Sequence, residues 1–236
     1  SLSKMTTEEY VRDDRFEVIG VGVKVNGGET EWASGTHEQI KKYLDSFPWA
    51  DSMMLAHNTA FDGFILSERF GITPKAYADT LSMARALHGT GVGGSLKVLA
   101  EHYGVGEKGT EVLKMEGKHR IDISPDDMKA YGEYCKNDVE LTYKLFGKMA
   151  PYFSEQEIHL IDTTLRMFTH PILYVDNTLL KDRLEELKQE KLDLLGSLKE
   201  KLKCGSEEEV RQKLASNKKF AELLKEFNVE PPIKTS

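Results

Sequence analysis

Long apolar runs are absent from this chain of 236 residues, and none approaches the roughly 20 residues that a membrane-spanning helix requires. The amino terminus also lacks the basic and then apolar pattern of a secretory signal peptide. We therefore expect a cytoplasmic protein that has no membrane partner.

Cysteine is scarce as well. Cys135 and Cys204 are the only two, and they lie on different predicted helices, so we expect no disulfide framework and a reducing compartment. Basic residues are outnumbered by acidic ones before residue 181. Residues 1–180 carry a net charge of −8, whereas residues 181–236 carry +1. This balance argues against purely electrostatic binding of nucleic acid. The acidic part is either a solvated surface or includes a metal-binding cluster.

A phosphate-binding loop is missing too, since the glycine-rich stretch Gly89–Gly94 is not followed by Lys-Ser or Lys-Thr. Predicted strands instead alternate with predicted helices up to about residue 150, which indicates an α/β sheet covered by helices. The strands are expected at 16–25, 30–34, 53–56 and 76–78, and a turn at Asn26-Gly27-Gly28 joins the first two. After Pro151 mainly helices are predicted. We therefore expect two domains, an α/β domain over 1–152 and an all-helical extension over 153–236.

The most informative stretch is Tyr134-Cys135-Lys136-Asn137-Asp138, inside a long predicted helix. Ser124, then Pro125 and two acidic residues, is a strong signal for the start of that helix. Tyr134 and Asp138 are four residues apart, so their side chains are neighbours on the helix surface. A phenol that orients a water, beside a carboxylate that binds a divalent cation, would be half of a metal-assisted hydrolytic site. Taken alone, the pair favours a simpler interpretation, a half-buried tyrosine beside a solvated aspartate.

A second group of polar residues, His57-Asn58-Thr59-Ala60-Phe61-Asp62, lies where a predicted strand passes into a helix. Asp62 could serve only as a helix cap and Asn58 only as a turn residue, because Asp and Asn are common at such positions. That interpretation accounts for each residue separately. It does not account for the second carboxylate, in a Tyr-x3-Asp pattern, farther along the chain.

Together these segments resemble the DEDD superfamily of 3′–5′ exonucleases, in particular the proofreading domain of family A DNA polymerases. Asn58-Thr59-Ala60-Phe61-Asp62, with Asn58 four residues before Asp62, is similar to the second motif of that family. Tyr134-x3-Asp138 is similar to the third motif, whose tyrosine marks the DEDDy branch. The resemblance covers roughly residues 16–149 and implies a ribonuclease H-like exonuclease fold, a mixed sheet flanked by helices. Further positions that agree with the family are Asp79-Thr80, Ser95 to Gly104 and Thr142.

The part after Pro151 resembles the linker and the start of the polymerase thumb, most closely in phage-type enzymes. The first motif of the family is Asp-x-Glu on the first strand, and no predicted strand of this sequence carries it. The only Asp-x-Glu is Asp138-Val139-Glu140, which lies inside the helix of the third motif. Residues 16–25 resemble the second strand of the family, so we expect the first strand to be missing from this chain.

The resemblance implies removal of mismatched 3′-terminal nucleotides by two-metal hydrolysis with Mg²⁺ or Mn²⁺ ions. In that reaction Asp138 would bind a metal directly, Asp62 would hold one mainly through water, and Tyr134 would orient the attacking water. Asn58 and Phe61 would support the site or the terminal nucleotide, whereas His57 is expected to be structural.

Basic residues in the irregular segment before Ser124 are candidates for contacts with the phosphates of single-stranded DNA. They are Lys114, Lys118, His119 and Arg120. A solvated loop accounts for the same residues more simply.

The partners implied by the resemblance are the single-stranded 3′ end of primer DNA and the polymerase palm and fingers of the same parent chain. The implied location is the cytoplasm of a bacterium or of a phage-infected host. Because the first motif is absent, we expect little or no exonuclease activity from this chain. The alternatives are a non-catalytic exonuclease-like scaffold or DNA-binding module, and a stand-alone DEDD ribonuclease, against which the thumb-like tail argues.

Overall fold

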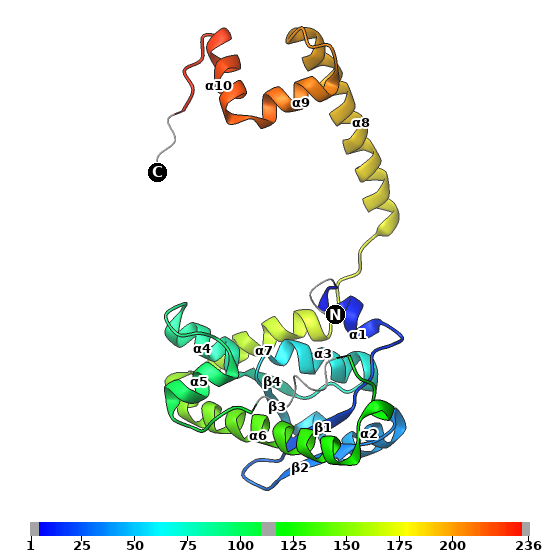
Figure 1. Cartoon of the computed structure of the whole chain (residues 1–236), viewed down its shortest axis with the longest axis vertical. Helices are drawn as coiled ribbons and strands as arrows, with labels where there is room; N and C mark the ends of the chain where they lie inside the picture. The colour runs from blue at the N-terminus through cyan, green and yellow to red at the C-terminus, as the bar shows by residue number, and fades with distance from the viewer. Residues whose placement is uncertain (1–4, 110–116, 233–236) are drawn as a thin grey trace. The chain divides into compact units, whose positions relative to one another are not determined.

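The computed structural model describes residues 5–109 and 117–232, and the chain divides into two compact units, 1–172 and 173–236. In the first unit, helices surround two small sheets (Figure 1). Its strands are β1 (Gly20–Lys24), β2 (Thr30–Ser34), β3 (Met53–Ala56) and β4 (Ala76–Asp79). Its α-helices are α1 (Thr7–Arg12), α2 (His37–Leu44), α3 (Thr59–Phe70), α4 (Thr80–His88), α5 (Leu96–Tyr103), α6 (Pro125–Met149) and α7 (Glu155–Thr169). The mixed α/β class expected from the sequence is therefore observed.

The strands form two separate pairs. Strands β1 and β2 are antiparallel, and their register runs from Gly20 opposite Ser34 to Lys24 opposite Thr30. Strands β3 and β4 are parallel, with Ala56 opposite Asp79 at their carboxyl ends. The sequence predicts one mixed sheet, but within the described residues no hydrogen-bonded ladder joins the two pairs. Strands β1 and β3 thus each pair along one edge only.

Both strand pairs nevertheless share one hydrophobic environment. Val21 and Val23 of β1 and Met54 of β3 pack against the same buried cluster, which α2 and α3 supply. Helix α6 contacts β1, β2 and β3, so a single helix covers both pairs. A second buried cluster joins α4 and α5 to the carboxyl half of α6, including Leu145 and Met149. Helix α6 is therefore held along its whole length.

Side-chain caps fix the starts of several helices, among them the one that the sequence predicts at Ser124. The Ser124 hydroxyl accepts a hydrogen bond from the Asp127 N–H at 3.2 Å, and Pro125 occupies the first turn of α6. Thr36 and Ser154 begin α2 and α7 with capping boxes in which both reciprocal bonds are present. These local bonds satisfy N–H groups that a helix start leaves unpaired.

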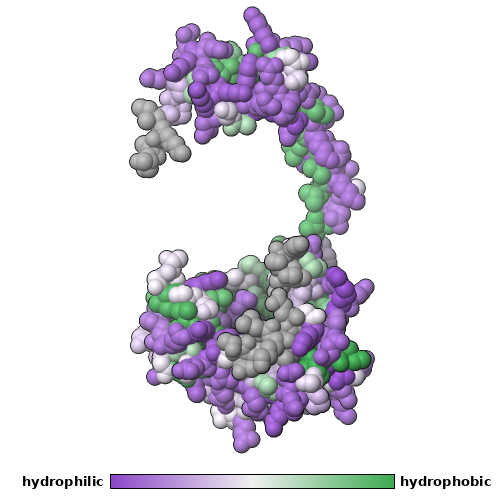
Figure 2. Space-filling view, in the orientation of Figure 1, coloured by the Kyte–Doolittle hydropathy of each residue, from purple (hydrophilic) through white to green (hydrophobic). Residues whose placement is uncertain are grey.

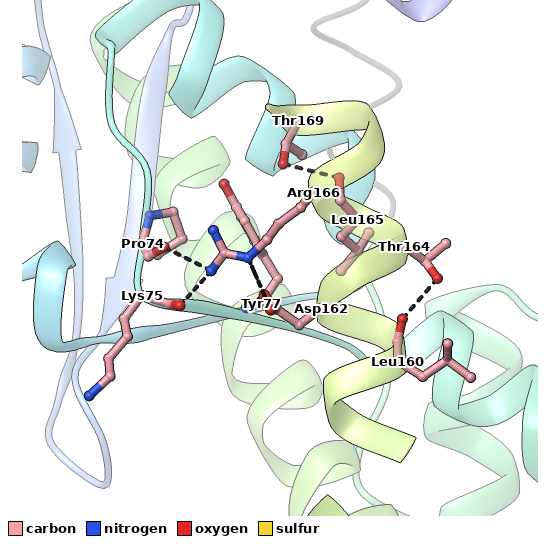
Figure 3. A network of polar contacts seen from close by, with 9 residues as sticks. All are labelled: Pro74, Lys75, Tyr77, Leu160, Asp162, Thr164, Leu165, Arg166 and Thr169. Carbon is pink, nitrogen blue, oxygen red and sulfur yellow. Dashed lines mark hydrogen bonds and ion pairs between the residues drawn. The ribbon is translucent and has the colours of Figure 1, made fainter. Parts of the chain in front are cut away.

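Helix α7 belongs to the first unit, although the sequence-based division at residue 152 assigns it to the extension. Figure 3 shows how it attaches to β4. The Tyr77 N–H donates to Asp162 Oδ1 at 2.8 Å, and Arg166 Nε lies 3.0 Å from Asp162 Oδ2. The Arg166 guanidinium also donates to the carbonyls of Pro74 and Lys75. Asp162 and Arg166 thus satisfy polar backbone groups in and just before β4.

The second unit consists of helices α8 (Asn177–Lys201), α9 (Glu207–Ala215) and α10 (Asn217–Glu226). Its small core contains Leu195, Cys204 and Val210. Figure 2 shows hydrophobic surface along α8, which carries a stripe of largely exposed leucines. The exposed members are Leu180, Leu184, Leu187 and Leu194. Among the described residues, no helix combines the length and the apolar character needed to cross a membrane.

Candidate active site

Tyr134 and Asp138 lie one turn apart on α6, as the spacing predicts. Tyr134 is only 8% exposed, and its ring stacks nearly parallel to that of Tyr131 at a centroid distance of 6.2 Å. Asp138 is half-buried, and its Oδ1 atom is buried without a hydrogen-bond partner among the described residues. A buried, unpaired carboxylate oxygen is costly, which makes it a natural place for a further donor or cation.

The other oxygen of Asp138 has a partner that the sequence analysis missed. Lys108, in the segment after α5, forms an ion pair with Asp138 Oδ2, and its ammonium lies 4.8 Å from the centroid of the Tyr134 ring. The backbone beside Lys108 is attached to α6, because Asn137 Nδ2 donates to the Glu107 carbonyl at 2.9 Å. No local signal marks Lys108 in the sequence, since its partners are 26 and 30 residues away.

Asp62 lies in the first turn of α3, and Phe61 precedes it as a half-buried residue. Asp62 is not the cap of this helix: the N-cap is Asn58, which has a left-handed backbone and makes no capping bond with its side chain. Asp62 as a residue is exposed, but neighbouring protein atoms desolvate its carboxylate. This desolvation, with a smaller effect from the charge of Asp79, raises the pKa of Asp62 to about 6.

Asp79, the last residue of β4, caps α3 with its side chain. Its Oδ1 atom accepts from the N–H groups of Asn58 at 2.8 Å and Thr59 at 3.2 Å. The same carboxylate caps α4, where it accepts from the N–H groups of Leu81 and Ser82. The second role is local in sequence, whereas the first joins residues that are 20 and 21 positions apart. One buried carboxylate therefore fixes the starts of two helices and, with them, the position of Asp62.

Asp62 on α3 and Asp138 on α6 both act electrostatically on one side chain, Cys135. Burial raises the pKa of the Cys135 thiol to about 11, and the charges of Asp138 and Asp62 both act in the same direction. His57 lies nearby: its Nδ1 is 2.8 Å from the Thr80 hydroxyl, and its Nε2 is 2.9 Å from the Gly94 carbonyl. Burial lowers the pKa of His57. Both ring nitrogens lie within hydrogen-bond distance of protein atoms, which favours the structural role expected for His57.

The other residues predicted to contact substrate lie at the surface. Asn58, Lys118 and Arg120 are exposed. Next to Lys118, Glu17 accepts from the Arg120 N–H at 3.0 Å and contacts His119 Nδ1 at 3.1 Å. These bonds tie the segment around Arg120 to the start of the chain. Lys114 lies outside the described residues.

The residues present do not fit a complete two-metal centre. The unpaired Oδ1 of Asp138 suits a cation, but Oδ2 is already paired with the Lys108 ammonium. Among residues 5–109 and 117–232, no group of three or more His, Cys, Asp or Glu side chains could hold a metal ion. A pair of divalent ions needs more oxygen ligands than two carboxylates on separate helices supply.

Comparison with known proteins bears on this arrangement. Residues 35–153, half of the chain, match a family model described as 3′–5′ exonuclease. The matched range contains α3, α6 and the residues Asp62, Lys108, Tyr134 and Asp138. No curated protein matches the chain.

Proposed function

The chain belongs to the 3′–5′ exonuclease family found in family A DNA polymerases, and from that membership we propose that it acts on the single-stranded 3′ end of primer DNA. The proposed reaction in the intact enzyme is hydrolytic removal of mismatched 3′-terminal nucleotides. The observation that carries the proposal is that two carboxylates inside the matched range, Asp62 of α3 and Asp138 of α6, act on the same side chain, Cys135, next to Tyr134.

The proposed fold is the ribonuclease H-like fold of the DEDDy branch. Two observations support it: in the described part of the chain β1 and β3 each pair on one edge only, and one cluster and one helix cover both strand pairs. A strand between β1 and β3 would join the two pairs into one mixed sheet. That strand is where the Asp-x-Glu of the first motif belongs in this family, and this sequence has no Asp-x-Glu outside α6.

In the intact enzyme, Asp138 and Asp62 would supply part of the carboxylate set for Mg²⁺ or Mn²⁺. The described residues alone do not complete that set. We therefore expect this chain by itself to have little or no exonuclease activity. Tyr134 would position the attacking water from its place beside Asp138.

The substrate-binding residues in this proposal are Asn58, Phe61, Lys118 and Arg120. The first two flank Asp62 at the start of α3, where an exposed amide and a half-buried ring could support a terminal nucleotide. Lys118 and Arg120 offer exposed positive charge for the DNA backbone. The second unit would be the start of the thumb, leading to the palm and fingers of the parent polymerase.

DNA binding by the chain can be measured by fluorescence anisotropy with a single-stranded oligonucleotide. We expect binding that weakens several-fold when Lys118 and Arg120 are both replaced by glutamine, because each contact with a phosphate contributes to affinity. Lys42→Gln combined with Lys148→Gln, which also removes two exposed positive charges, one on α2 and one on α6, is the matched control and should leave binding unchanged. Equal loss with the control would show that binding reflects net charge alone.

Cleavage is tested by incubating the chain with a mismatched primer and Mg²⁺. The expected result is little or no digestion. Robust Mg²⁺-dependent digestion that Asp138→Ala abolishes would mean that the first motif is dispensable, and the expectation of weak activity would be wrong.

A second candidate function is a non-catalytic exonuclease-like scaffold or DNA-binding module. The pairing of Lys108 with Asp138 favours it, because the carboxylate already has a resident positive charge. The gene sequence that precedes Ser1 distinguishes the two: an apolar strand with Asp-x-Glu there supports the exonuclease, and a parent gene without one supports the scaffold.

A further inference from the structure

Lys108 is the one residue of the site that neither composition nor motif spacing explains. Its ammonium pairs with Asp138 Oδ2 and lies over the Tyr134 ring. The two side chains of the ion pair are 23% and 24% exposed, so water screens the pair only in part. The Lys108 ammonium is therefore held by two attractions, an ion pair with the aspartate and a cation–π contact with the ring.

The backbone just before Lys108 is anchored to α6. The Asn137 amide donates to the Glu107 carbonyl, and Gly106 lies so close to α6 that an added Cβ would be 2.9 Å from the Leu141 side chain. Lys108 therefore reaches Asp138 from a fixed stretch of backbone. The electrostatic influence of its charge extends to its neighbours: it lowers the pKa of His57 in the same direction as burial, and it lowers the pKa of Cys135 against the larger, raising effect of burial.

We infer that Lys108 is the resident cation of this site and that it opposes the binding of a divalent ion at Asp138. The inference rests on the proposed function, because it concerns the carboxylate assigned to the metal. A divalent ion that approached Asp138 would have to displace the ammonium from Oδ2 and would meet its repulsion at short range. Binding at Asp138 is thus coupled to movement of Lys108.

The alternative explanation is general charge. Lys136 provides the comparison, because it lies on α6 two residues from Asp138 but pairs with Glu133 at 2.6 Å. Lys136→Gln removes one positive charge near the site without touching the contact with Asp138. Lys108→Gln removes the same charge together with that contact.

The experiment measures Mn²⁺ binding to the full chain from the fall in the EPR signal of the free ion. We expect Lys108→Gln to bind Mn²⁺ about tenfold more tightly than the unaltered chain, because a contacting positive charge is lost. Lys136→Gln should bind as the unaltered chain does. Lys108→Gln combined with Asp138→Asn should lose the gain, which assigns it to Asp138.

Equal Mn²⁺ affinity of Lys108→Gln and the unaltered chain would overturn the inference, whether both bind weakly or both tightly. An equal gain from Lys136→Gln would overturn it as well. Lys108→Arg keeps the charge and should bind Mn²⁺ as weakly as the unaltered chain, so it tests the inference even if the glutamine variant folds poorly. Near-UV circular dichroism checks the folding of each variant.

The outcome is separable from that of the proposed function. If the chain binds single-stranded 3′ ends but Lys108→Gln gains no Mn²⁺ affinity, only the inference about Lys108 fails. If Lys108→Gln gains Mn²⁺ affinity at Asp138 but the chain does not bind DNA, the proposed function fails and the inference about Lys108 stands.

Discussion

Replacing Asp162 by alanine removes the side chain that joins α7 to β4. Asp162 is only 7% exposed, and its Oδ1 atom accepts from the Tyr77 N–H at 2.8 Å. The loss leaves that buried N–H without an acceptor, which costs about 1–3 kcal/mol. The Arg166 guanidinium loses its carboxylate as well, and because this side chain is 34% exposed the ion pair adds at most about 1 kcal/mol.

The expected loss in the free energy of unfolding is therefore about 3 kcal/mol, which lowers Tm by roughly 6–12 °C for a unit of this size. Asp162→Asn is the matched variant. Its amide oxygen can still accept from Tyr77, whereas the charge opposite Arg166 is gone, so we expect a loss of about 1 kcal/mol. Urea unfolding with linear extrapolation measures both losses.

Two outcomes would refute this reasoning. If Asp162→Ala unfolds within about 0.5 kcal/mol of the unaltered chain, the Tyr77 N–H does not depend on the carboxylate. If Asp162→Asn costs as much as Asp162→Ala, the charge matters and the hydrogen bond to β4 does not. Either result would also mean that the polar contacts of Asp162 do not explain why α7 packs in the first unit.

Two further predictions concern the site and the helix that carries it. Asp62 has a pKa of about 6 in the folded chain, above its ordinary 3.8, so its stabilising contribution is present below pH 3.8 and is lost as the pH rises through 6. The free energy of unfolding of Asp62→Asn, relative to that of the unaltered chain, should therefore rise by about 1 kcal/mol between pH 4 and pH 8, a value reduced to allow for the exposure of Asp62. Thermal melts of both proteins at the two pH values measure this difference. A difference that does not change with pH would contradict the prediction. Gly132→Ala would place a Cβ 2.7 Å from the Trp32 ring and should cost about 1–3 kcal/mol in urea unfolding. Gly147→Ala on the same helix meets nothing within 4 Å and should stabilise by about 0.5–1 kcal/mol; a similar effect of both changes would show that helix propensity outweighs the contact with Trp32.

The starts of the helices could be predicted from the sequence because capping is local. Ser124, Thr36 and Ser154 each bond to an N–H three residues along, so the whole interaction lies within a few letters of sequence. Tyr134 and Asp138 could be paired for the same reason, as neighbours on one helix.

The remaining features depend on contacts between residues far apart in sequence. Lys108 meets Asp138 across 30 residues, and Asp162 meets Tyr77 across 85. No periodicity or motif specifies such pairs, because they form only when whole elements pack together. The division of the sheet into two pairs was missed on the same grounds, since strand pairing is decided by neighbours in space and not by the propensity of each strand.

Asp79 has a consequence for how sequence variation in this domain should be interpreted. Because one buried carboxylate serves the backbones of α3 and α4 together, any replacement must disturb two helices at once. In a survey of related sequences, we therefore expect Asp79 to vary as little as a catalytic acid would. Its oxygens nevertheless accept hydrogen bonds from N–H groups and a serine hydroxyl. Asp62, an exposed residue that caps nothing, has no such structural restraint. Invariance at Asp62 would then report chemistry, whereas invariance at Asp79 would report architecture.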